Sequence, residues 1–288
     1  KGLHALAEIP VVPNLAMADR FLALVPENDG ESFFADVQRV PPGHVVTLTR
    51  DWATARKYWR PDLTELRLKS DGDYEEALRE QLDRAVGDRL RGTGNRIAAT
   101  LSGGLDSAAV TATAARLMAS QGGSVTAFTA VPREGFAGRG IGDSIADEGP
   151  LAARVAEMHS NIEHVLVRSS GGSPLGNLDR YFFLCERPFL NLCNGVWTWD
   201  LLSAAKEHRL QILLTGSLGN ITLSYDGMAF LTQLLRQGRL VRLARESLAL
   251  RRDGTRLGSV AAQALGPFLP PALWRAVRRA RRKTARLS

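Results

Sequence analysis

This sequence has little cysteine, and it lacks long apolar runs and a secretory signal. Its two cysteines, Cys185 and Cys193, are too few for a disulfide framework and are not clustered as zinc ligands. We expect them to be structural thiols in a reducing cytoplasm. No apolar run reaches membrane-spanning length, and no signal pattern opens the chain. The start at Lys1 rather than Met predicts a truncation or a processing site.

Most of the chain also lacks an excess of either charge. The net charge is +7, but the last eighteen residues, 271–288, hold seven basic side chains and no acidic one. The remainder is balanced at 30 basic and 30 acidic residues, so a general nucleic-acid-binding surface is not indicated. The tail is able to meet RNA or an acidic partner. We favour a solvated helix face, or an end exposed by truncation.

The stretch 96–110 carries the clearest functional signal. An apolar run of strand length leads into a turn that begins at Ser102 and holds two glycines, and a helical pattern follows. Glycine lets the backbone approach an anion, and a helix start attracts negative charge through its free N–H groups and its dipole. Ser102 and Ser107 add hydroxyl donors. Asp106 would repel phosphate, so its usual purpose is to hold a bridging divalent cation.

The string Ser-Gly-Gly-Leu-Asp-Ser at 102–107 resembles the pyrophosphate loop of ATP pyrophosphatases, and its last three residues are similar to the asparagine synthetase branch. A Walker A loop would need Gly-Lys followed by Ser or Thr, and the chain has no Gly-Lys dipeptide. From the residues alone, one alternative remains. It is an ordinary strand-to-helix turn with Asp106 as the helix cap.

Strands and helices alternate on both sides of this loop. An amphipathic helix is expected at 73–91, and the expected strands are 97–101, 125–131, 164–167 and 211–214. This alternation predicts an α/β fold, a parallel sheet with helices on both faces, followed by helical C-terminal additions. Ligands in such sheets bind beyond the carboxyl ends of the strands, which here are Ser102, Ala130, Val167 and Thr215.

The first sixty residues do not read as a complete domain. They hold Phe-Phe at 33–34, Pro-Pro-Gly-His at 41–44 and Tyr-Trp-Arg-Pro at 58–61. This order resembles the junction between the two domains of asparagine synthetases. It implies that residues 1–60 are the remnant of a glutaminase-like domain with its linker, and that 61–288 are an ATP-dependent synthetase domain. Neither cysteine matches the family's N-terminal nucleophile, so no glutaminase activity is expected of this stretch.

A second strand runs into a glycine turn and polar residues at 213–227. At the comparable place, asparagine synthetases have a catalytic glutamate and a magnesium-binding aspartate. Alignment on Thr215-Gly216 puts Ser217 and Asn220 at these two positions, so both acids are missing. Asn220 offers a carbonyl oxygen without charge, and Asp226 is a carboxylate nearby in sequence.

The strings at 219–227 and 186–191 resemble the branch of the family that includes the lasso peptide macrolactam cyclases. The resemblance implies an adenine nucleotide α-hydrolase-like fold and AMP-forming amide synthesis with ATP and Mg²⁺. It implies Asp106 as metal ligand, Asp106, Ser217 and Asn220 as catalytic residues, and a precursor peptide freed by a protease as substrate. The nucleotide-binding residues implied are Leu101, Ser102, Gly103, Gly104, Leu105, Asp106, Ser107, Ala130, Thr215 and Gly216, with Leu101 and Ala130 at the adenine.

Three alternatives stay open: a true asparagine synthetase, a non-catalytic nucleotide-binding paralogue and an RNA-linked protein that uses the basic tail. Asp147 and Glu148 contact magnesium or a substrate amine, or else favour a helix start through their charge. We expect a structural role for His164 and packing roles for Trp197 and Trp199. Arg133 and Arg139 reach phosphates or lie in a solvated loop.

Overall fold

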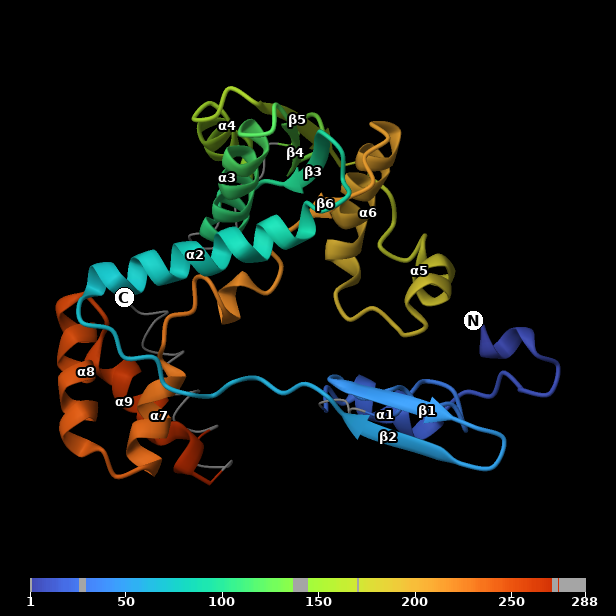
Figure 1. Ribbon diagram of the computed structural model, residues 1–288, viewed down its shortest axis with the longest axis horizontal. Coiled ribbons are helices and arrows are strands. Elements are labelled where there is room, and N and C mark those ends of the chain that lie inside the picture. Colours follow the sequence, from blue (N-terminus) through green and yellow to red (C-terminus); the bar gives the residue numbers. More distant parts are fainter. Residues whose placement is uncertain (1, 26–29, 137–144, 170, 271–273, 275–288) are drawn as a thin grey trace. The chain divides into compact units, whose positions relative to one another are not determined.

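The computed structural model describes residues 2–25, 30–136, 145–169, 171–270 and 274 (Figure 1). The chain divides into two compact units, Lys1–Gly216 and Ser217–Ser288. Arg139, and all of the basic tail except Trp274, lie outside the described residues. Among the described residues, every helix is too short or too polar to cross a membrane.

The first unit is built on a parallel sheet of four strands in the order β5-β4-β3-β6. The strands are β3 (Arg96–Thr100), β4 (Ser124–Val131), β5 (Ile162–Arg168) and β6 (Leu213–Leu214). The helices are η1 (Leu3–Ala5), α1 (Leu15–Leu22), α2 (Asp71–Arg89), α3 (Leu105–Ala119), α4 (Gly149–Ala156), α5 (Leu178–Cys185) and α6 (Leu192–Glu207). A separate antiparallel pair is formed by β1 (His44–Leu48) and β2 (Ala53–Lys57).

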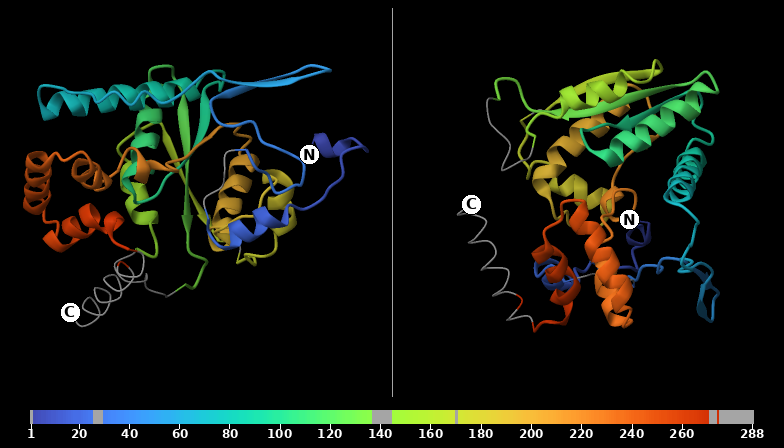
Figure 2. Two further views of the ribbon diagram at one scale, coloured as in Figure 1. Left: turned by 90° about the horizontal axis from the view of Figure 1, so that it is seen from below. Right: turned by 90° about the vertical axis from the view of Figure 1, so that its left-hand side faces the viewer.

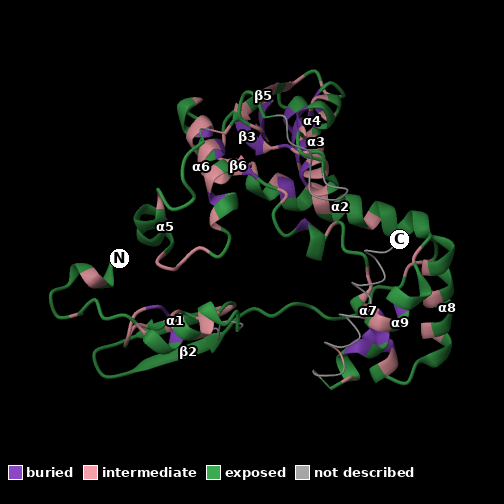
Figure 3. Ribbon diagram, turned by 180° about the vertical axis from the view of Figure 1, so that it is seen from behind, coloured by how far each residue is buried: buried purple, intermediate pink, exposed green. Residues whose placement is uncertain are grey.

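Helices cover both faces of the parallel sheet, as the sequence predicts (Figures 1 and 2). Side chains alternate along each strand, so Ile97 and Ala99 pack with α3 while Ala98 packs with Leu201 of α6. α4 packs beside α3 on the same face through Ala152. Buried residues concentrate in these strands and in the helix faces that meet them (Figure 3). The sheet therefore presents a rigid carboxyl edge from which loops can emerge.

Helix α2 begins at Asp71, two residues before the predicted start. Its start is set by a capping box: Ser70 Oγ accepts from the Asp73 N–H at 3.2 Å, and Asp73 Oδ2 accepts from the Ser70 N–H at 2.9 Å. Val86 anchors the helix in the cluster formed with α3, and Arg116 of α3 pairs with Asp83. α2 therefore packs beside α3, in a cluster that also includes Ile97 and Leu214 of the sheet.

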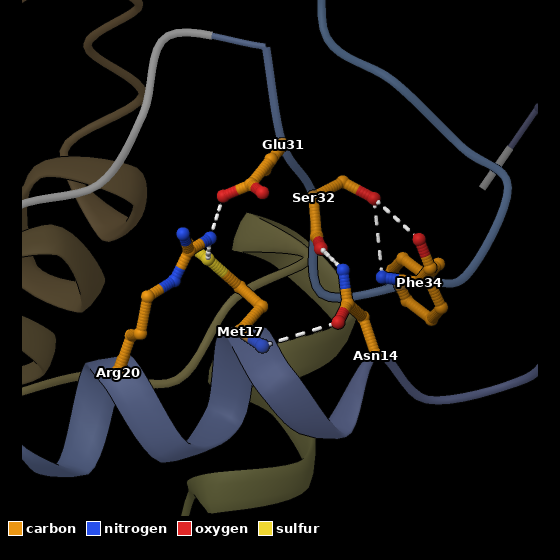
Figure 4. Close-up of polar contacts among 6 residues, drawn as sticks. All are labelled: Asn14, Met17, Arg20, Glu31, Ser32 and Phe34. Atoms are coloured by element: carbon orange, nitrogen blue, oxygen red, sulfur yellow. Dashed lines mark hydrogen bonds and ion pairs between the residues drawn. The ribbon is translucent and has the colours of Figure 1, made fainter.

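The N-terminal segment has its own polar anchors (Figure 4). Asn14 caps α1, since its Oδ1 accepts from the Met17 N–H at 3.1 Å, and its side-chain nitrogen donates to the Ser32 carbonyl at 3.2 Å. Arg20 pairs with Glu31. These contacts tie the helix to the segment that follows it.

Two motifs of the N-terminal segment meet at Gly43. Gly43 has a φ of +69°, and a Cβ there would lie 2.5 Å from the Trp59 carbonyl oxygen. The Tyr58 and Trp59 N–H groups both donate to the Gly43 carbonyl, at 2.8 and 3.2 Å. Only glycine fits this position, which gives a physical reason for the glycine of Pro-Pro-Gly-His beside Trp59. The predicted domain boundary at residue 60 stays a prediction.

The second unit is helical, as predicted. Its elements are η2 (Gly219–Ile221), α7 (Ala229–Arg236), α8 (Leu240–Arg252), α9 (Leu257–Leu265) and η3 (Gly266–Phe268). Leu231 of α7 is buried against Val260 and Ala264 of α9. The Thr232 hydroxyl joins the same helices by donating to the Gln263 carbonyl at 2.7 Å.

Candidate active site

The turn after β3 is held by hydrogen bonds between its own two serines. Ser102 Oγ and Ser107 Oγ are 2.7 Å apart, and the Ser102 N–H donates to Ser107 Oγ at 3.0 Å. Ser107 Oγ donates to the Gly104 carbonyl, and Ser102 Oγ accepts from the Gly104 N–H, both at 3.2 Å. Both hydroxyl protons are thus used inside the loop. The expectation that these hydroxyls stand free as donors is not met. The amides of Ser102 and Gly104 are used inside the turn as well, so the N–H groups of the first turn of α3, at 105–107, are what this segment offers to an anion.

Helix α3 begins directly after this turn without a capping side chain. Gly104 is its N-cap and makes no side-chain cap hydrogen bond, while Asp106 lies within the first turn. The interpretation of Asp106 as the helix cap is therefore wrong. Gly103 and Gly104 are both exposed. An uncapped helix start on an exposed glycine turn suits an anion, because its amides and the positive end of its dipole lie open.

The carboxylate of Asp106 has an unusual environment. Its Oδ1 atom is buried and has no hydrogen-bond partner among the described residues. A buried polar atom without a partner is costly and calls for an explanation. A bound cation would supply the partner that this oxygen lacks. No cluster of three or more metal-ligating side chains occurs in the described part of the chain. Mg²⁺ often binds with this donor set, since one or two carboxylates plus substrate phosphates and water suffice.

Gly216 brings the end of β6 against the start of α3. A Cβ on Gly216 would lie 2.5 Å from Ser107 N and 2.8 Å from the Asp106 carbonyl carbon. Both atoms belong to backbone, which cannot move aside as a side chain can. β6 and β4 pair with opposite edges of β3, so the chain leaves β3 for one side of the sheet and later returns to the other. In α/β sheets, ligands usually bind in the crevice between the loops at such a position. The structure thus brings together residues 102–107 and Gly216, as predicted.

Over residues 77–285, the chain matches the family described as asparagine synthase. The chain belongs to the asparagine synthase family. No curated protein matches it. Among solved structures, it is similar to the NH3-dependent NAD synthetase from Campylobacter jejuni subsp. jejuni NCTC 11168 in complex with the nitrate ion, at 15% identity. That similarity covers 73% of this chain and 94% of the other, with a TM-score of 0.34.

Membership of the asparagine synthase family supports ATP-dependent amide ligation as the general activity, and ATP use is expected of the loop. The two residues predicted at the adenine differ in environment. Leu101 is 2% exposed and packs with Ala127 and Ala152, whereas Ala130 packs on the opposite face with Phe128. Their side chains point into the two halves of the core.

Helix α4 supports the phosphate loop from a second direction. Glu148 Oε2 accepts from the Gly103 N–H at 3.4 Å, and a Cβ on Gly103 would lie 2.8 Å from a methyl carbon of Leu151. Asp147 instead accepts from the Gly149 N–H at 2.9 Å. The charged pair is therefore split: Asp147 stabilises the helix start, and Glu148 reaches the loop. A side chain at position 103 would require Leu151 to shift.

Ser217 and Asn220, the positions of the family's two acids, belong to the second unit and are both exposed. Asn220 lies in the short helix η2, which follows Leu218 in a left-handed conformation at φ +67°. Asp226 Oδ1 accepts from the Met228 N–H at 3.0 Å, which engages it in the turn before α7. The catalytic assignment of Ser217 and Asn220 stays a prediction.

The segment that resembles the cyclase branch is organised by Tyr181. Its hydroxyl donates to the Gly195 carbonyl, and its ring stacks on Phe189 at 5.2 Å and meets Trp199 edge-on at 5.7 Å. Burial raises the pKa of Tyr181, and the nearby Asp200 and Cys185 add to the rise. Trp199 therefore packs, as expected, whereas Trp197 is 42% exposed.

Three smaller predictions also have outcomes. Both cysteines are free, as expected, but both are exposed, so neither packs in a core. Arg133 is exposed. His164 lies inside β5, where it contacts Thr129 of β4 at 2.8 Å. Sequence reasoning missed Thr129, because a threonine within an apolar strand carries no signal of its partners.

Proposed function

We propose that this chain is an AMP-forming carbon–nitrogen ligase that activates a carboxylate with ATP and joins it to an amine. The observation that carries the proposal is the buried Oδ1 atom of Asp106, which has no hydrogen-bond partner among the described residues and lies in the first turn of an uncapped helix. Such a helix start offers amides to pyrophosphate, and the carboxylate fits a magnesium ion bound to the same phosphates. Membership of the asparagine synthase family supports the same reaction class.

The reaction balances in two steps. A carboxylate oxygen of the substrate attacks the α-phosphorus of ATP, the bond to the β-phosphate oxygen breaks, and pyrophosphate leaves. An amine nitrogen then attacks the activated carbonyl carbon, AMP leaves, and the nitrogen loses a proton. The amides at 105–107, at the uncapped start of α3, hold the departing pyrophosphate as charge develops on it. Asp106 would hold Mg²⁺, which neutralises phosphate charge when bound.

The substrate that we favour is a peptide, as in the lasso peptide macrolactam cyclases. By resemblance, Ser217 and Asn220 stand where the parent enzymes have a glutamate and an aspartate. Serine is a poor base near neutral pH, and two negative charges are missing, so ammonia and aspartate would be handled poorly. A peptide is positioned by many remote contacts, and orientation alone can lower the barrier by several kcal/mol. A leader-removing protease would then be a natural partner.

The test compares two substrate pairs in one assay. The chain is incubated with ATP and Mg²⁺, either with aspartate and ammonium or with linear peptides that carry a free α-amine and an internal acidic side chain. We expect AMP and a cyclised, dehydrated peptide by mass spectrometry, with no asparagine. Steady formation of asparagine, with an equal amount of AMP, would show that the chain is a true asparagine synthetase. ATP binding without AMP from either pair would indicate a non-catalytic paralogue.

A further inference from the structure

A line of polar contacts, buried at Leu101 and Thr129 and half-buried at His164, joins β5 and β4 to the start of the phosphate loop. The Thr129 hydroxyl on β4 donates to the Leu101 carbonyl at 2.7 Å and lies 2.8 Å from Nε2 of His164 on β5. Thr129 is 1% exposed, and Leu101 is 2% exposed. The buried hydrogen bond between Thr129 and Leu101 is stronger than it would be in water, and leaving either of these two groups unpaired would be costly.

The chemistry of the three groups fixes the direction of both bonds. A carbonyl oxygen only accepts, so the single hydroxyl proton of Thr129 points to Leu101. Thr129 Oγ must then accept from His164, which requires a proton on Nε2. Burial lowers the pKa of His164 and favours the neutral ring, which has one N–H. The neutral Nε2–H tautomer is therefore the form that completes the line.

Leu101 connects this line of hydrogen bonds to the phosphate loop. Its N–H donates to the Phe128 carbonyl at 2.9 Å, and its carbonyl accepts from Thr129, so both of its backbone polar groups are fixed by β4. The next residue is Ser102, whose N–H and hydroxyl set the shape of the turn. A displacement of the Leu101 carbonyl would therefore pass directly to the amides at the start of α3.

We propose that Thr129 and His164 are a positioning pair that sets the Leu101 carbonyl and, through it, the amides that hold pyrophosphate. Neither residue is placed in contact with substrate. The effect on catalysis rests on the proposed function. The arrangement of protons and the order of the loop do not, so they can be tested in the ligand-free protein.

The chain offers a matched control for ordinary core damage. Thr126 lies on the same strand, is also 1% exposed, and also donates to a residue of β5, Glu163, at 3.2 Å. Its side chain faces the α6 side of the sheet, away from Leu101. Thr126→Val and Thr129→Val remove the same hydroxyl from the same strand, and only the second breaks the line to the loop.

The first measurement is the histidine tautomer, read by long-range proton–nitrogen NMR on the full chain, with His164→Gln for assignment. We expect the Nε2–H form in the wild type and in Thr126→Val, and a mixed population in Thr129→Val. Exchange of the Ser102 amide should be faster in Thr129→Val only. A protonated Nδ1 with bare Nε2 in the wild type would overturn the proposal, as would unchanged Ser102 exchange in Thr129→Val.

The second measurement is kcat/KM for ATP. Thr129→Val should lower it roughly tenfold, since small misplacements of binding groups are costly, and Thr129→Ser should restore it because the hydroxyl returns. Thr126→Val should stay within about twofold at a comparable melting temperature. Equal losses of kcat/KM in Thr126→Val and Thr129→Val would show that Thr129 and His164 contribute only core packing. Absence of ATP turnover in the wild type would count against the proposed function, and the NMR result would still decide the pair.

Discussion

Gly216 and Ser107 touch through their backbones: a Cβ on Gly216 would lie 2.5 Å from Ser107 N. This contact joins the end of β6 to the first turn of α3, so the two informative motifs of the sequence meet within the first unit. It also gives a physical reason for a glycine after Thr215. The carboxyl end of the sheet is shaped at this point by the absence of a side chain.

Gly216→Ala should therefore damage the site. The added methyl would push against backbone, and overpacking of this kind costs about 1–3 kcal/mol. We expect a lower melting temperature and at least tenfold weaker ATP binding by calorimetry. The control is Gly87→Ala in α2, where a Cβ would meet Leu117 at an ordinary 3.9 Å. That helix substitution should leave ATP binding unchanged and add up to about 1 kcal/mol of stability. Normal ATP binding by Gly216→Ala would show that the contact is not needed.

Asp106→Asn should separate function from stability. The amide keeps the size of the side chain but removes the charge, so magnesium-dependent ATP turnover should be lost. Stability of the ligand-free protein should be unchanged or higher, because a neutral amide costs less to bury without a partner than a charged carboxylate oxygen does. Asp179→Asn, another first-turn acid, at the start of α5, is the control and should retain turnover. Wild-type turnover in a folded Asp106→Asn protein would exclude the metal role.

His164 should contribute a pH dependence to folding. Burial lowers its pKa in the folded protein, so between the two pKa values the unfolded chain binds a proton that the folded chain does not. Stability from this residue is therefore complete above the unfolded value of about 6.5 and declines as the pH falls below it. Urea unfolding from pH 8 to pH 5 should show this decline in the wild type and a flatter curve in His164→Gln. Parallel curves would mean that the folded and unfolded pKa values are equal.

The local parts of the fold could be predicted from the sequence because they depend on short-range rules. The glycine turn at 103–104 marks where β3 ends, and the apolar runs mark the strands. β2 was missed because all five of its residues are exposed and show no alternation. α6 begins at Leu192, and the Asn191 side chain caps this start by accepting from the Asn194 N–H. That cap is a local signal that the sequence interpretation overlooked.

The contacts of the site depended on partners far apart in sequence. The sequence placed Ser102, Ser107 and Asp106 at the loop, but not the bonds that use up both serine hydroxyls. It placed Glu148 at a helix start, but not its reach to Gly103, 45 positions away. Thr129 and His164 looked like strand residues, because only the pairing of β4 with β5 brings them together. Such contacts require the register of the sheet, which spacing along the chain does not supply.

The central claim, activation of a carboxylate as an acyl-adenylate, is tested most directly by isotope transfer. The chain is incubated with ATP, Mg²⁺ and acidic peptides whose side-chain carboxylates carry ¹⁸O, and the phosphorus products are read by ³¹P NMR. Asp106→Asn serves as the background. The account predicts equal amounts of AMP and pyrophosphate, with one ¹⁸O atom in each AMP phosphate. Formation of ADP and inorganic phosphate, or of AMP without the label, would contradict it.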